Sequence, residues 1–280
     1  YGRIAEAGEF PYRLDYPFHL LIFFFPFGLI EDFALARAAW MAVSEIALLG
    51  VALLSVELVQ WKPSRALLTL FLGFSLAGWY SFSAIMEGSV TPLLAFFFIA
   101  ALWMLREGQD VIAGILLIFT TYKWEVTWFV WLLLLVWLIS HRRGRALAIT
   151  LMGFAVLMVI SLLLLPSWPL EFLRATVANL RAVHGLTLDL VLQNWWPERG
   201  QLFATVLKTT LFVVLFVEWR AVRGKDFRRF VWVASLTLAV TPLIGIPNVS
   251  TDYAFLLFPL ALVSAVSNER WPRFGSGVAA

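Results

Sequence analysis

The chain has 280 residues, of which 61% are hydrophobic and 14% are charged, and its mean hydropathy is +0.86. This composition excludes a soluble globular protein, because too little polar surface remains to cover a core of that size. The net charge is only +3, so the placement of the cations is more informative than their excess.

Several kinds of reactive site are excluded by residue type. The chain has no cysteine, which excludes a disulfide framework, a thiolate nucleophile and a zinc-finger site. His19, His141 and His184 lie far apart and do not form an HExxH motif or similar metal-binding spacing. Neither GxGxxG nor the phosphate-loop motif GxxxxGK[ST] occurs.

Apolar runs follow one another along almost the whole chain, separated by short charged connections. A segment inside lipid must satisfy its own backbone hydrogen bonds, so these runs are predicted to be helices. We therefore expect an all-α, polytopic helical membrane protein that forms a single integral membrane domain over residues 1–280. About nine spans are expected, at 34–59, 66–86, 90–105, 109–122, 124–140, 146–166, 202–219, 230–246 and 253–267.

The first apolar run, residues 18–30, differs from the later ones. It has only 13 residues and contains Pro26, so it is too short and too interrupted to span a bilayer. A short interfacial or re-entrant helix over 17–30 fits better. The chain opens on Tyr1 without a signal peptide, and we expect it to be part of a longer protein.

The charged connections predict an orientation. Thirteen of the 21 cations fall in alternate connections, at residues 62–65, 106, 142–145, 220–229 and 270–273, whereas the intervening short connections hold only Arg37 and Lys123. The positive-inside rule makes the first set and the C-terminus cytoplasmic. Eleven of the 18 acidic residues lie on the other, external side.

The one long connection, residues 167–200, is external in this orientation and is expected to fold. Pro169 can begin a helix, Gly185 can end it, and one apolar face is formed by Leu173, Val177, Leu180 and His184. This pattern predicts an amphipathic helix on the outer leaflet. Trp195 and Trp196 then lead back to the interface, where tryptophan is common. Sugar stacking on them is the alternative.

Lys123 is the most informative single residue. The run before it, Val111 to Tyr122, rises only about 18 Å against a hydrocarbon core of roughly 30 Å. A lysine below the membrane surface needs a carboxylate, a phosphate or a water-filled cavity, which makes it a functional candidate. The structural alternatives are that Lys123 reaches to the interface or pairs with Glu125 or Glu87. Asp252 and Tyr253 lie at the same predicted mouth, where Asp252 is also a plausible helix N-cap.

Three stretches resemble a known family. DYPFHLLIFFFPFGLIEDFALARAAW, EGSVTPLLAFFFIAALWMLREGQDVIAGILLIFTTYKWE and NVSTDYAFLLFPLAL are similar, in order, to segments of lipid-linked glycosyltransferases of the GT-C superfamily. The likeness is greatest to glycosyltransferase family 87 and related mannosyl- and arabinosyltransferases. The similarity extends over most of the chain.

The resemblance implies transfer of a sugar, with inversion, from a polyprenyl-phosphate donor to a lipid or glycan acceptor on the external face of a bacterial or archaeal plasma membrane. It implies no nucleic-acid partner and no certain cofactor, and it leaves a divalent cation open. The residue that matches the family's phosphate-binding lysine is Lys123. Other substrate-binding candidates are Glu87, Glu125, Arg181, His184, Trp195, Trp196, Arg199, Asp252 and Tyr253.

The family's catalytic aspartate belongs to a first external loop that follows a first span, and both are expected to precede Tyr1. Asp15 is the nearest acidic substitute in this chain. Two other function classes remain: a transporter or lipid flippase, which would favour an internal repeat with ionisable groups near the midplane, and a non-catalytic membrane scaffold, which would need neither Lys123 nor a folded outer segment.

Overall fold

The computed structural model describes residues 17–182, 187–244 and 249–270, and this part of the chain is helical and contains no strand. The expected all-α class is therefore confirmed. The helices are, in chain order, η1 (Phe18–Leu20), α1 (Leu21–Gly28), α2 (Phe33–Leu58), α3 (Arg65–Ala77), α4 (Trp79–Met86), α5 (Thr91–Arg106), α6 (Asp110–Phe119), η2 (Thr120–Lys123), α7 (Trp124–Ser140), α8 (Gly144–Leu164), α9 (Trp168–Ala182), α10 (Leu188–Trp195), α11 (Gly200–Ala221), α12 (Phe227–Ile244), η3 (Ser250–Leu256) and α13 (Leu257–Arg270).

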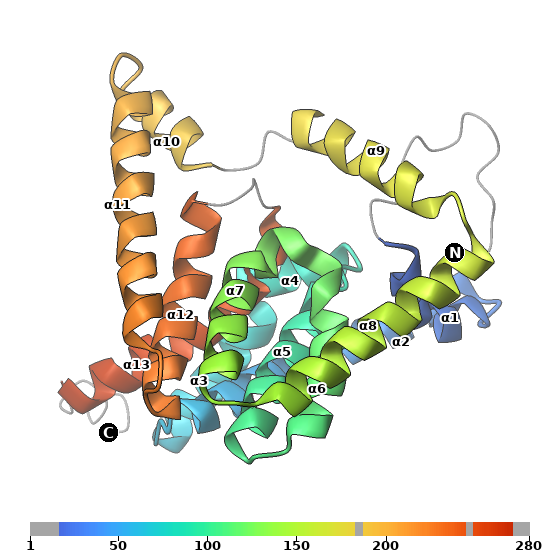
Figure 1. The fold of residues 1–280 in the computed structure, drawn as a ribbon, viewed down its shortest axis with the longest axis horizontal. Coiled ribbons are helices and arrows are strands. Elements are labelled where there is room, and N and C mark those ends of the chain that lie inside the picture. Colours follow the sequence, from blue (N-terminus) through green and yellow to red (C-terminus); the bar gives the residue numbers. More distant parts are fainter. Residues whose placement is uncertain (1–16, 183–186, 245–248, 271–280) are drawn as a thin grey trace.

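The core of the bundle is built around α5. This helix packs against both α2 and α6, while α7 packs against α12 and α13 against α2 (Figure 1). Leu94, Phe98, Ile99 and Leu102 of α5 are all at most 1% exposed. A helix that is apolar all round and sits centrally removes much of its surface from both water and lipid, which makes α5 the rigid support of the bundle.

Among the described residues, the helices that are long and apolar enough to span a membrane are fewer than the nine spans expected. Among the described residues, five helical segments are long and apolar enough to cross a bilayer, and α3 with α4, bent by 43°, makes a sixth if the pair is one span. The remaining predicted spans correspond to α5, α6 and α7, which have 16, 10 and 17 residues. The count of nine is therefore not confirmed, because a helix such as α6 rises only about 15 Å.

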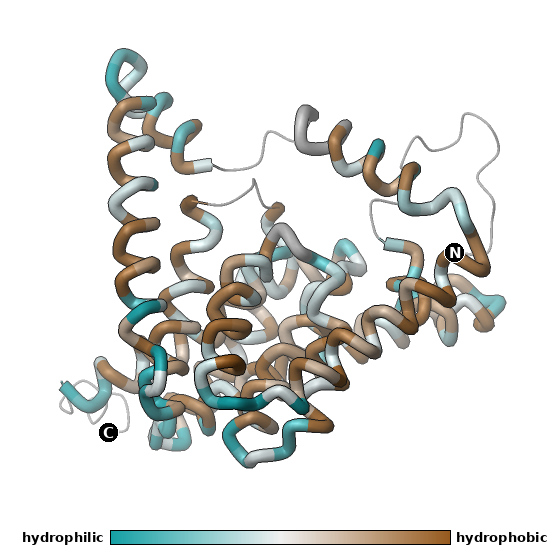
Figure 2. The backbone as a smooth tube through the Cα atoms, in the orientation of Figure 1, coloured by the Kyte–Doolittle hydropathy of each residue, from teal (hydrophilic) through white to brown (hydrophobic). Residues whose placement is uncertain are grey.

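The polar connections gather at two ends of the bundle. We call one the basic end, which contains the connections 59–64, 107–109, 141–143 and 222–226 and is the lower, hydrophilic end in Figure 2. Ion pairs and hydrogen bonds join its helices: Arg106 to Glu57 at 2.7 Å, Arg143 to Asp110 at 2.6 Å, and His141 Nε2 to the Lys225 carbonyl at 2.8 Å. The connections 87–90 and 120–123 lie at the opposite end.

The long connection between α8 and α11 carries the helices α9 and α10 (Figure 1). Leu170, Leu173 and Val177 of α9 are exposed, as expected for an amphipathic helix whose apolar side meets lipid rather than protein. The start of α9 is held by Trp168, whose ring lies 5.7 Å from that of His19. Burial lowers the pKa of His19 to about 4, so its ring is neutral at pH 7 and packs with the apolar residues around it.

Candidate functional site

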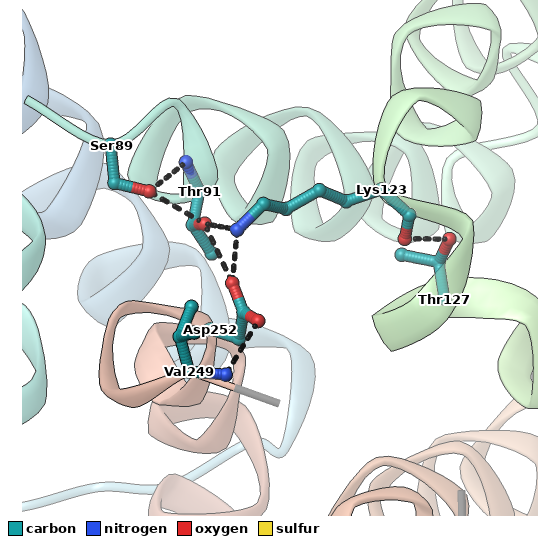
Figure 3. Close-up of polar contacts among 6 residues, drawn as sticks. All are labelled: Ser89, Thr91, Lys123, Thr127, Val249 and Asp252. Carbon is teal, nitrogen blue, oxygen red and sulfur yellow. Dashed lines mark hydrogen bonds and ion pairs between the residues drawn. The ribbon is translucent and has the colours of Figure 1, made fainter. Parts of the chain in front are cut away.

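Lys123 is the last residue of η2, where the chain turns between α6 and α7. The short 3-10 segment releases backbone carbonyls from regular helical bonding, and the Thr127 hydroxyl donates to two of them, the carbonyls of Thr120 at 3.1 Å and of Lys123 at 2.9 Å. This local bonding fixes the backbone from which the Lys123 side chain extends into the bundle (Figure 3). The side chain is almost completely buried, with 3% of the residue exposed.

Asp252 is the partner of this lysine. The two side chains form an ion pair between Lys123 Nζ and Asp252 Oδ1, across a sequence separation of 129 residues. Asp252 lies in the first turn of η3, and its second oxygen, Oδ2, accepts the backbone N–H of Val249 at 3.2 Å. The Asp252 carboxylate therefore accepts a backbone N–H at the start of η3, as expected for a helix N-cap, and also pairs with the buried ammonium.

Two hydroxyl groups complete the cluster. Lys123 Nζ donates to Thr91 Oγ1 at 3.0 Å, Thr91 Oγ1 donates to Asp252 Oδ1 at 3.4 Å, and the hydroxyls of Ser89 and Thr91 lie 2.9 Å apart (Figure 3). Thr91 is fully buried and Ser89 is 8% exposed. We call Ser89, Thr91, Lys123 and Asp252 the ammonium cluster.

The end of α4 places Ser89 in this cluster. The N–H of Gly88 bonds the Ile85 carbonyl at 3.2 Å and the N–H of Ser89 bonds the Ala84 carbonyl at 2.9 Å, with Gly88 at φ +68°. This is the glycine-terminated helix end in which the chain turns through the left-handed region. The Gly88 carbonyl also accepts Trp40 Nε1 at 3.0 Å, which ties the turn to α2.

The electrostatics of the cluster follow from its burial. Burial of an isolated ammonium or carboxylate at this position would cost much free energy of desolvation. The ion pair with its hydroxyl partners reduces that cost. The cluster therefore holds a positively charged nitrogen at a fixed point near one end of a hydrophobic bundle. Such a fixed cation can bind and stabilise a negatively charged group that approaches it.

The other predicted site residues lie in different parts of the structure. Tyr253 follows Asp252, and its ring lies 4.7 Å from that of Tyr80. Glu87 is exposed, and the ion pair that Lys123 forms among the described residues is with Asp252. Trp195, Trp196 and Arg199 are exposed around the turn from α10 to α11, where the two indole rings meet edge to face at 6.0 Å.

Four of the expected residues are not described. Asp15 and His184 lie outside the described residues, and the side chains of Glu125 and Arg181 do so as well. Thr91 and Ser89 were not predicted as site residues; the only signal for them was the small, polar start of the segment GSVTP. Among the described residues, no three His, Asp or Glu side chains gather as metal ligands.

Comparison with known families decides the affiliation of the chain. The sequence model of glycosyltransferase family 87 matches residues 14–242, which is most of the chain. The chain belongs to glycosyltransferase family 87. Ser89, Thr91 and Lys123 lie inside the matched range, whereas Asp252 lies ten residues beyond it. No curated protein and no solved structure matches the chain.

Membership in glycosyltransferase family 87 agrees with the expected resemblance and supports a transferase that takes a sugar donor and an acceptor. Together with the helices that are long and apolar enough to span a bilayer, it supports an integral membrane protein. Among the described residues, the ammonium cluster holds a buried lysine paired with a buried aspartate.

Proposed function

We propose that this protein transfers a sugar, with inversion, from a polyprenyl-phosphate donor to an acceptor on the external face of the membrane, and that Lys123 binds the donor phosphate. The observation that carries the proposal is the buried Lys123 ammonium, held by Thr91 and Asp252 at one end of the bundle. Family membership supplies the reaction class.

The charge requirement of the reaction fits this cluster. A bond forms between the acceptor oxygen and the anomeric carbon while the bond from that carbon to the phosphate oxygen breaks, so negative charge grows on the departing lipid phosphate. A preorganised ammonium at that oxygen lowers the barrier because it needs no reorientation during the step. Asp252 and Thr91 keep the nitrogen in place, and the phosphate joins them as a further anionic partner.

The proton of the acceptor must go to a base, and Asp252 does not fit that role. Its Oδ1 is engaged by Lys123 and Thr91, and its Oδ2 by the Val249 N–H. A general base must be within hydrogen-bond reach of the proton it removes, whereas Asp252 is only 4% exposed and is held by these contacts beside a buried ammonium. We assign Asp252 as a positioning residue; Asp15 remains the proposed acidic substitute within this chain.

A transfer assay on the full-length protein in lipid nanodiscs tests the proposal. Lys123→Met alone leaves Asp252 unpaired, so the informative variant is Lys123→Met with Asp252→Asn, which removes both charges and nearly conserves volume. We expect this double variant to fold and to lose about 100-fold or more in kcat. Lys225→Met, at an exposed lysine of the basic end, is the matched control and should transfer sugar like the wild type.

The proposal fails if the folded double variant retains the kcat of the wild type, because the reaction then does not need the Lys123 charge. It also fails if the wild-type protein moves labelled polyprenyl phosphate across liposome membranes without transferring sugar. That second result would favour the flippase alternative instead.

A further inference from the structure

A carboxylate lies on the outer face of α2, in the middle of a candidate membrane span. Glu45 is the thirteenth of the 26 residues of this helix and is exposed, and the next residue, Ile46, is 69% exposed. Along the helix axis, Glu45 lies about 18 Å from Phe33 and about 20 Å from Leu58. Since the hydrocarbon core of a bilayer is roughly 30 Å thick, Glu45 falls near its centre.

Glu45 lacks a side-chain partner within the described part of the chain. It forms neither an ion pair nor a side-chain hydrogen bond there, and the residues three and four positions away along α2 are all apolar. Glu57, the other glutamate of α2, differs because it pairs with Arg106 at 2.7 Å. Ionisable residues in membrane spans almost always face a bundle interior or a cavity and pair there. The exposure of Glu45 therefore indicates that a polar partner covers this face.

The cations near the apolar segments do not supply this partner. Lys123 pairs with Asp252, and Lys208 pairs with Asp189. Arg37 lies eight residues before Glu45 on α2, about 12 Å away along the helix, and it donates to the Met86 carbonyl at 3.3 Å. In the sequence, residues 1–16 and 271–280 contain no run of about 20 apolar residues, so neither can form a spanning helix beside α2. The missing cation must come from outside residues 1–280.

The same face of α2 allows another helix to approach closely. Ala34, Ala38 and Ala42 are exposed and follow one another at intervals of four residues, so they line one side of the helix, and Glu45 lies one turn further on. In lipid, helices associate through close packing and polar contacts, and small residues at this spacing let two backbones come together. We call Ala34, Ala38, Ala42 and Glu45 the alanine–glutamate face.

We propose that the alanine–glutamate face binds a membrane-spanning helix from outside residues 1–280 that carries a lysine or arginine near the middle of the bilayer. The alanines give the partner helix room to approach, and its cation pairs with Glu45. Charge complementarity selects this occupant. A second copy of the chain, related by a twofold axis, would place Glu45 against Glu45, and lipid chains offer no hydrogen-bond donor.

Binding of synthetic helices to the 280-residue chain in lipid vesicles tests the proposal. Two peptides of about 24 leucine and alanine residues differ only at the centre, where one has lysine and the other has leucine. Energy transfer is measured between a dye on the peptide and a dye on Glu31→Cys, an exposed position just before α2 in a chain without native cysteine. We expect the chain to bind the lysine peptide about fivefold more tightly than the leucine peptide.

Two variants separate the charge from the shape of the face. Glu45→Leu should abolish the preference for the lysine peptide, because it removes the carboxylate. Ala38→Leu with Ala42→Leu should weaken the binding of both peptides about fivefold, because it adds bulk where the partner approaches and leaves the charge in place. All three positions are exposed, so these changes remove no buried contact and the variants should fold.

A matched control moves the carboxylate to another span. Glu45→Leu with Val156→Glu places it on α8, at a position that is 55% exposed. We expect this variant not to regain the preference for the lysine peptide, because the row of exposed alanines belongs to α2.

The proposal is overturned if the chain that retains Glu45 binds both peptides equally or binds neither. It is also overturned if Val156→Glu restores the preference, because any lipid-exposed carboxylate would then suffice. Energy transfer between two labelled copies of the chain that the lysine peptide does not reduce would identify a second copy as the occupant and would contradict the proposal as well. Sugar transfer enters none of these measurements, so their outcome is independent of the function proposed for the ammonium cluster.

Discussion

Lys123 and Asp252 depend on each other because both are nearly withdrawn from solvent, at 3% and 4% exposed. The attraction between the two charges offsets the loss of hydration only while both are present. Thr91 forms hydrogen bonds with both partners and so adds a third side chain to the contact. The pair thus holds a charged nitrogen at a fixed position inside an apolar bundle.

A double-mutant cycle measures this dependence. Lys123→Met alone should lower the free energy of unfolding by roughly 3–5 kcal/mol, because it leaves the Asp252 carboxylate buried without its counter-charge. Adding Asp252→Asn should restore most of that loss. The measurement is chemical or thermal unfolding of the purified protein in detergent; additive losses in the double variant would show that the two charges are not coupled.

The sequence was sufficient to single out Lys123 but not to build its surroundings. A lysine inside an apolar run is conspicuous because its burial is costly, and Asp252 was recognised at the same predicted mouth. Their direct contact could not be predicted, since the residues are 129 positions apart and the pairing depends on how η3 packs on α5. Thr91 and Ser89 are common, uncharged residues, and only the fold shows what they bond.

At the scale of elements, tight helix ends position polar side chains at both ends of the bundle. The helices α2, α4 and α5 each end with a residue in the left-handed region, namely Gln60, Gly88 and Gly108. Each such end lets the chain reverse within a few residues while the last carbonyls of the helix remain bonded. Consequently Ser89 reaches the ammonium cluster at one end of the bundle, and Trp61 and Lys62 lie in the connection after α2 at the basic end.

The two glycine ends provide a matched pair of substitutions. Gly88→Ala and Gly108→Ala place a side chain at φ +68° and +74°, with no atom closer than 3.8 Å to the new Cβ. Each should therefore cost roughly 1 kcal/mol of stability from backbone strain. Only Gly88→Ala should also reduce kcat in the transfer assay, because it disturbs Ser89 and Thr91. Equal activity of the two variants would mean that the turn at Gly88 does not position the cluster.

The lengths of the elements explain why the count of nine spans is not confirmed. Hydropathy marks an apolar run but does not show where the helix within it breaks. The run at 109–122 ends as a helix at Phe119 and continues as η2, because Thr120, Thr121 and Thr127 hydroxyls bond local carbonyls. Such side-chain bonds compete with the regular helical pattern. The short α6 is what allows Lys123 to lie within the bundle.

At the scale of the whole molecule, exposed apolar surface and polar ends are separated. The outer faces of α8 and α11 are rich in exposed Leu, Val and Phe. Only 11% and 17% of the most hydrophobic 18-residue stretch of each helix is buried. This surface requires lipid or another apolar partner. The connections 87–90 and 120–123, which carry Ser89 and Lys123, lie at the other ends of α5 and α6 from the connection 107–109 of the basic end. The positive-inside rule predicts that the basic end faces the cytoplasm.

The absence of cysteine makes this orientation directly measurable, because every introduced thiol is the only one in the chain. Arg142→Cys and Lys225→Cys place a thiol at exposed positions of the basic end, whereas Glu31→Cys and Glu198→Cys place one at exposed positions of connections predicted to be external. In sealed, right-side-out vesicles, a membrane-impermeant maleimide should label the second pair at once and the first pair only after permeabilisation. Labelling of Glu198→Cys and Arg142→Cys from the same side would contradict the orientation, and it would place the proposed transfer site on the wrong face for an external acceptor.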